Sequence, residues 1–141
     1  MTNNGTYEIS VESSFREWWR YNVFITAACY APDGTLADYA GVRDCIYEPS
    51  DGKLKREKPQ NYDPKRISHV SAPRCSRLEI YVYVIANTMP SDDAIKHSPP
   101  FEASVSVTQN GKSLLRQNFE VNQWGGSSLR FDIEGTALPI E

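Results

Sequence analysis

Residues 101–121, FEASVSVTQNGKSLLRQNFEV, decide the fold of this chain. Asn110-Gly111 lies at the middle of the stretch, and Asn-Gly is a strong signal for a tight turn because both residues tolerate a positive φ. Apolar residues recur at every second position before the turn and return after it, at Phe101, Ala103, Val105, Val107, Leu115, Phe119 and Val121. The stretch therefore predicts a β-hairpin with one buried face.

The parity of the apolar positions predicts the shape of this turn. A two-residue loop at Asn110-Gly111 would place Val105 opposite Arg116 and mix apolar with polar residues on each face. An odd-length loop pairs odd positions with odd positions and restores one apolar face. We therefore predict a three-residue loop with Gly111 left-handed in a bulge.

Further strands are expected on both sides of this hairpin. Alternation predicts strands over residues 6–12 and 77–86, the latter central, and another carrying Leu129, Phe131 and Ile133. The long stretch 15–30 favours strand over helix even at 15–20. Two more turns are expected, at Asp33-Gly34 and Asp51-Gly52.

The pattern is weakest between residues 36 and 74. Short strands are expected at 44–48 and 53–58, the second one charged as an edge strand should be, and residues 60–65 are expected to form a loop.

These segments predict an all-β, single-domain antiparallel β-sandwich of about eight strands. A C2-like, jelly-roll or immunoglobulin-like strand order fits equally well. The expected boundaries are a disordered N-terminus at 1–5, the sandwich at 6–134 and a loose C-terminal tail at 135–141.

Composition narrows the partners and the compartment. The net charge of −3 argues against a nucleic-acid partner, although Lys53, Lys55, Arg56 and Lys58 form a local basic cluster. No apolar run is long enough to span a membrane, and residues 1–5 lack the features of a secretory signal. Three widely spaced cysteines match neither a disulfide framework nor a zinc site, so we expect a reducing, cytoplasmic location.

The chemistry-bearing residues do not form a catalytic or cofactor motif. His69 and His97 lack the surroundings of a nucleophile and base, so we expect no enzyme and no cofactor. Four aspartates, Asp33, Asp38, Asp92 and Asp93, suggest calcium, but no spacing here reproduces the ligand loops of C2 domains. Turn chemistry accounts for Asp33, and we expect no metal site.

Aromatic side chains are the better candidates for a binding surface. Trp18, Tyr81 and Tyr83 lie on the less apolar faces of their expected strands, and Trp124 lies in a glycine-rich bend. We predict that these four contact a partner. The long connection 88–100 supplies loop-binding candidates in Asp92, Asp93 and His97.

The expected function is a non-catalytic protein-interaction or assembly domain that binds a protein partner or its own copies. One alternative is a C2-like, calcium- or phosphate-dependent module that binds a membrane surface through the aspartate loops or residues 53–58. A second alternative is a carbohydrate-binding module that stacks sugar rings on Trp18 or Trp124.

Overall fold

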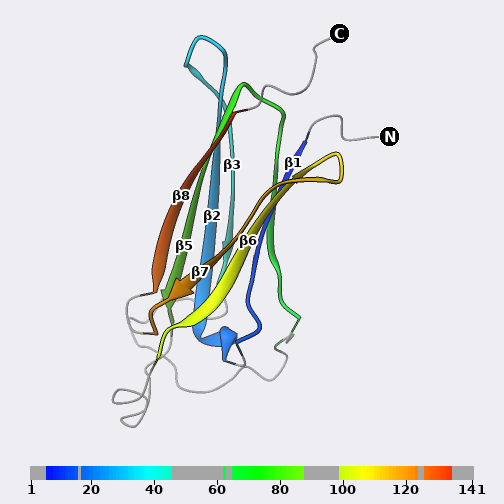
Figure 1. Cartoon of the computed structure of the whole chain (residues 1–141). Coiled ribbons are helices and arrows are strands. Elements are labelled where there is room, and N and C mark those ends of the chain that lie inside the picture. Colours follow the sequence, from blue (N-terminus) through cyan, green and yellow to red (C-terminus); the bar gives the residue numbers. More distant parts are fainter. Residues whose placement is uncertain are drawn as a thin grey trace.

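The chain folds into two four-stranded antiparallel sheets (Figure 1). The computed structural model describes residues 6–15, 17–45, 62, 65–87, 99–123 and 126–134. Sheet A has the strand order β4-β1-β6-β7 and sheet B the order β3-β2-β5-β8. The elements are β1 (Tyr7–Glu12), η1 (Trp18–Arg20), β2 (Tyr21–Tyr30), β3 (Leu36–Asp44), β4 (Ser68–Ala72), β5 (Arg77–Ala86), β6 (Phe101–Gln109), β7 (Lys112–Val121) and β8 (Ser127–Glu134). The all-β fold with two antiparallel sheets, expected from the sequence, is confirmed.

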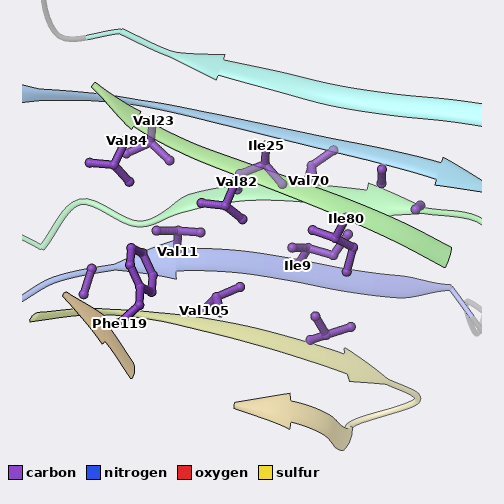
Figure 2. Close-up of a cluster of buried hydrophobic side chains, with 14 of the residues drawn as sticks. Ile9, Val11, Val23, Ile25, Val70, Ile80, Val82, Val84, Val105 and Phe119 are labelled. Atoms are coloured by element: carbon purple, nitrogen blue, oxygen red, sulfur yellow. The ribbon is translucent and has the colours of Figure 1, made fainter. Parts of the chain in front are cut away.

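The core lies between the two sheets and follows the alternation of the strands. Odd positions of β1, β2 and β6 and even positions of β5 point inward (Figure 2). The largest wholly buried aliphatic side chains include Ile9, Val11, Val23, Ile25, Leu78, Ile80, Val82, Val84 and Val105. Each of them contributes roughly 1.5–3 kcal/mol of transfer free energy, so this layer holds the two sheets together and leaves their outer faces available for other contacts.

The β6–β7 hairpin keeps the expected parity but reaches it by another device. Gln109 pairs with Lys112, so the loop has two residues, and Asn110 and Gly111 both have positive φ, at 53° and 77°. The register then shifts between Val107 and Thr108, and Val107 pairs with Leu115. The prediction of a three-residue loop is wrong. The extra residue is accommodated in a bulge within the strands, where it corrects the parity equally well.

The segment expected to begin the second strand is helical instead. Residues 18–20 form the 3-10 helix η1, in which the Trp18 N–H donates to the Phe15 carbonyl at 3.0 Å. The chain crosses here from sheet A to sheet B, so it has no neighbouring strand with which to pair. The Ser13 hydroxyl donates to the Glu102 carbonyl at 2.6 Å and accepts the Phe15 N–H at 3.1 Å, which guides this crossing.

The weakly patterned middle of the chain contains two strands that the sequence did not predict. β3 is an edge strand that ends at Asp44, where a short strand had been expected to begin, and β4 follows at Ser68–Ala72. The expected edge strand 53–58, the turn at Asp51-Gly52 and the tail 135–141 lie outside the described residues. Within the described ranges, no helix is long and apolar enough to cross a membrane.

Candidate functional site

The outer face of sheet B carries more aromatic and large apolar side chains than the outer face of sheet A. Register places Phe24 beside Tyr83 and Arg43, and Thr26 beside Tyr81 and Gly41, on the outer side of sheet B. We define the aromatic face as the outward-pointing residues Phe24, Tyr30, Leu36, Tyr39, Tyr81, Tyr83 and Ile85 of β2, β3 and β5. Outward positions of sheet A carry mainly short polar or charged residues, including Glu8, Ser10, Ser104, Ser106, Thr108 and Asn118.

Large apolar side chains are exposed mainly on the aromatic face. The described part of the chain has five exposed large hydrophobic residues, and four of them belong to this face: Tyr39 at 60%, Leu36 at 58%, Ile85 at 47% and Tyr83 at 40%. The fifth, Ile67, precedes β4 at the edge of the other sheet. Scattered apolar residues are normal on a protein surface, whereas their concentration on one side of a sheet favours a contact surface. By register, Leu36 and Tyr39 lie towards the Tyr30 end of β2 and Tyr83 and Ile85 towards its Asn22 end, with Tyr81 between the two pairs.

Aromatic and cationic side chains hold one another in place on this face. The rings of Tyr81 and Tyr83 stack with centroids 6.4 Å apart and planes 7° apart. The Arg43 guanidinium lies 5.6 Å from the centroid of the Phe24 ring. Such contacts restrict the rotamers of these side chains, so a partner would meet a surface that is already ordered.

One end of sheet B's outer face carries an ionic cluster centred on Glu79. Its carboxylate accepts hydrogen bonds from Arg130 and from the Tyr30 hydroxyl, the latter at 3.1 Å. Arg77 forms a salt bridge with Asp132 at 3.1 Å, and its guanidinium lies 4.2 Å from the centroid of the Tyr30 ring. The hydrogen bonds from Arg130 lower the pKa of Glu79, and the hydrogen bond to Glu79 raises the pKa of Tyr30. These partners satisfy one another, so we assign this cluster a structural role that fixes Tyr30 at the border of the aromatic face.

The lowered pKa of Glu79 gives a pH prediction. Because the folded-state pKa lies below the ordinary value of 4.5, the ionised carboxylate stabilises the fold above that pH, and the contribution is lost as pH falls through the folded-state pKa. We expect Glu79→Gln to lower the free energy of unfolding near neutral pH and to match the wild type more closely under acidic conditions. Urea unfolding at several pH values checks this, and a difference between the two proteins that does not shrink at low pH would contradict it.

A polar recess of about 310 Å³ lies beside sheet A, where the end of β1 meets β6 and β7. Seven of its eight lining residues are polar or charged: Glu12, Ser13, Ser14, Glu102, Ser104, Arg116 and Asn118. This lining is mainly polar, so it offers hydrogen bonds to a small polar molecule and less apolar than polar surface. It is therefore a poorer surface for a protein partner than the aromatic face.

No family model and no curated protein matches this chain. Two crystal structures are similar to it. A DUF4425 family protein from Bacteroides ovatus has 16% identity and a TM-score of 0.43, and the match covers 96% of this chain and 99% of that one. A domain of unknown function, DUF4425, from Bacteroides vulgatus has 10% identity and a TM-score of 0.42, with 95% of this chain and 98% of that one covered.

The predicted partner-binding residues separate into three groups. Tyr81 and Tyr83 lie together on the aromatic face. Trp18 is only 1% exposed, so the expectation that it reaches the surface is wrong. Its ring packs in the core against Tyr21 and Phe101. Trp124 lies outside the described residues, as do the loop-binding candidates Asp92, Asp93 and His97.

The remaining polar candidates have local partners. The Asp33 carboxylate accepts the Thr35 N–H at 3.0 Å and its hydroxyl at 2.7 Å, which lowers the pKa of Asp33 and matches the expected turn role. His69 Nε2 lies 2.6 Å from a carboxylate oxygen of Glu8 on the exposed outer side of sheet A. Within the described ranges, no three His, Cys, Asp or Glu residues lie together in a way that could hold a metal ion.

Sequence reasoning missed the half of the aromatic face that comes from β3 and from the far end of β5. Leu36 and Tyr39 lie in a region where no strand was expected over 36–43. Ile85 was expected in the central strand 77–86 on the same side as Tyr81 and Tyr83, but it was not named as a partner-binding residue, and its side chain is exposed. The sequence did contain a signal for this exposed apolar face. Tyr81, Tyr83 and Ile85 occupy alternate positions of one strand, and three such residues in a row are more apolar than the side of a strand that faces only water.

Proposed function

We propose that this chain is a non-catalytic protein-interaction domain and that it binds a protein partner through the aromatic face. The observation that supports this is the segregation of exposed apolar side chains, four of the five in the described residues, onto one side of sheet B. Burying such a group against a partner releases water from apolar surface and favours association.

The mixture of residue types favours a protein over a sugar as the ligand. Tyrosine and arginine are among the residues most enriched at the energetic centres of protein interfaces. Arg43 and Arg77 stand beside the aromatic rings here, at 5.6 Å from Phe24 and 4.2 Å from Tyr30. Leu36 and Ile85 add aliphatic surface that a sugar ring would not use. Stacking of sugars was expected on Trp18 or Trp124, and Trp18 is buried.

The membrane-surface alternative draws on other parts of the chain. It depends on Asp92, Asp93 and residues 53–58, all of which lie outside the described residues. The aromatic face needs none of them, so the two proposals separate cleanly in an experiment that changes only sheet B.

A photo-crosslinking experiment tests the proposed face. A benzophenone amino acid is placed at position 83 on the aromatic face, or at position 67 as the control, because Ile67 is exposed but lies off this face. We expect position 83 to yield discrete protein adducts in native extract, or a covalent dimer in the purified protein if the partner is a second copy. Position 67 should yield neither.

Matched serine variants give the affinity change. Ile85→Ser removes an exposed isoleucine side chain from the aromatic face, and Ile67→Ser removes an exposed isoleucine side chain that lies off this face. Tyr83→Ser removes one of the two stacked rings. We expect Tyr83→Ser to weaken binding by about 30-fold, since truncating a central interface residue costs about 2 kcal/mol or more. Equal crosslinking from positions 83 and 67, or equal affinity of Ile85→Ser and Ile67→Ser, would overturn the proposal.

A further inference from the structure

Two cysteines that are far apart in the sequence lie at the same end of the sandwich. Cys29 lies next to the last residue of β2, and Cys75 lies in the connection between β4 and β5. Both thiols are reduced in this structure, with Cys29 buried and Cys75 partly exposed. The Cys75 thiol donates to the carbonyl of Arg77 at 3.3 Å, and Arg77 pairs with Tyr30, the residue after Cys29.

Backbone and side-chain contacts hold the two residues at this place. The Ser76 N–H donates to the Tyr30 carbonyl at 3.0 Å, which ties the residue after Cys75 to the residue after Cys29. The Cys29 thiol also donates to the Pro73 carbonyl at 3.5 Å, and the Tyr7 hydroxyl donates to the Cys75 carbonyl at 3.4 Å. The β4–β5 connection is therefore fixed against the end of β2, and these contacts keep Cys29 and Cys75 at the same end of the sandwich.

We propose that Cys29 and Cys75 form a disulfide when the protein meets a small disulfide oxidant, and that this bond crosslinks β2 to the β4–β5 connection. The Cys75 thiolate attacks one sulfur of the oxidant RSSR, and RSH is released as the oxidant's S–S bond breaks. The Cys29 sulfur then attacks Cys75 Sγ in the mixed disulfide and displaces the second RSH. The two cysteines lose two electrons and two protons, and RSSR is reduced to two RSH.

Exposure sets the order of these two steps. Cys75 is the partly exposed thiol, so the oxidant reaches it first, while Cys29 is enclosed by the core. Burial and the neighbouring Cys75 raise the pKa of Cys29 to about 12, so few Cys29 thiolates exist at neutral pH. Closure by Cys29 is therefore the slow step, and the mixed disulfide at Cys75 is the expected intermediate.

The crosslink would change stability through the unfolded chain. It closes the chain between residues 29 and 75, and a loop of this length removes much of the conformational freedom of the unfolded state. For a domain of this size the expected gain is a rise in Tm on the order of 10 °C.

A redox titration tests the proposal with the third cysteine, Cys45, as an internal control. The folded protein and its variants Cys75→Ser and Cys45→Ser are equilibrated with mixtures of oxidised and reduced glutathione, and intact mass, peptide maps and Tm are measured. We expect wild type and Cys45→Ser to lose two hydrogens, to show a peptide joining Cys29 to Cys75, and to melt at higher temperature.

The Cys75→Ser variant should show neither the joined peptide nor the higher Tm. The Tm of Cys75→Ser under reducing conditions shows whether this variant is folded. In a second variant, Cys29→Ser, the reaction should end at the mixed disulfide between Cys75 and glutathione. A mixed disulfide that persists on wild-type Cys75 at equilibrium, a bond that involves Cys45, or an internal disulfide without a change in Tm would overturn the proposal.

Discussion

Replacing Gly126 by alanine is expected to destabilise the fold by about 4 kcal/mol or more, which is among the largest effects of a single substitution. A Cβ atom at this position would lie 1.9 Å from the Val84 carbonyl oxygen and 2.9 Å from its carbon, in the backbone of the central strand β5. The backbone of a paired inner strand cannot move aside as a flexible side chain can. Gly126 also has φ of 76°, which is unfavourable for a residue with a side chain.

The clash matters because Gly126 positions the last strand. Its N–H donates to the Asn122 carbonyl at 2.8 Å and its carbonyl accepts the Asn122 N–H at 3.2 Å, so the two residues close the connection between β7 and β8. β8 then pairs with β5 from Ser127 onward. Pushing Gly126 away from Val84 would therefore separate β8 from the sheet that carries the aromatic face.

Gly111→Ala is the matched control for this substitution. Gly111 has nearly the same φ, 77°, but a Cβ atom there meets nothing within 4 Å. Only the left-handed conformation is penalised, at about 1–2 kcal/mol. Urea unfolding of both variants separates the conformational cost from the clash, and a Gly126→Ala protein no less stable than Gly111→Ala would contradict the interpretation of this contact.

The hairpin shows how far alternation in a sequence can predict structure. The odd apolar positions of β6 and β7 required odd residues to pair with odd residues, and Val105 does pair with Gln117 and Ala103 with Phe119. The same parity follows from a three-residue loop or from a two-residue loop with a later bulge. The two solutions bury the same side chains, so the hydrophobic pattern could not distinguish between them.

The edge strand β3 could not be predicted in the same way, and neither could the two residues, Leu36 and Tyr39, that it adds to the aromatic face. Edge strands bury little, and in β3 Ala40 and Val42 are only partly buried while the outward Tyr39 is large and apolar. The contrast between the two sides of this strand is therefore weak or reversed. Apolar alternation finds strands by their buried side, so it fails where the functional signal is an apolar side exposed to solvent.

Trp18 was misplaced for a different reason. Counting alternate positions backward from β2 assigned it to the outer side of a strand, but the 3-10 helix η1 interrupts the period of two before β2 begins at Tyr21. One helical turn rotates the indole into the core. It packs against Tyr21 with centroids 6.0 Å apart and meets Phe101 edge-on at 5.9 Å.

Trp18→Ala is accordingly expected to cost about 3–5 kcal/mol of unfolding free energy, the range for deleting a large buried aromatic. Part of this loss comes from the contact between the indole ring and the Arg66 guanidinium, which lies 5.4 Å from the ring centroid. The same guanidinium donates to the Trp18 carbonyl at 3.1 Å and to the Asp44 carboxylate at 2.9 Å. Without the ring, this buried arginine faces a cavity instead of an aromatic surface. Thermal or urea unfolding measures the cost, and a loss below about 1 kcal/mol would contradict the buried placement of Trp18.

Trp18→Phe distinguishes a packing role from a binding role for this residue. It keeps one ring against Tyr21 and removes an indole N–H that has no hydrogen-bond partner among the described residues, so its cost should stay near 1.5 kcal/mol. Because Trp18 is buried away from the aromatic face, the folded Trp18→Phe protein should bind a partner as the wild type does. Trp18→Ala should then lose binding only in proportion to the fraction unfolded, whereas Tyr83→Ser should lose binding while remaining folded. Weakened binding by folded Trp18→Phe would instead place the tryptophan in the contact surface.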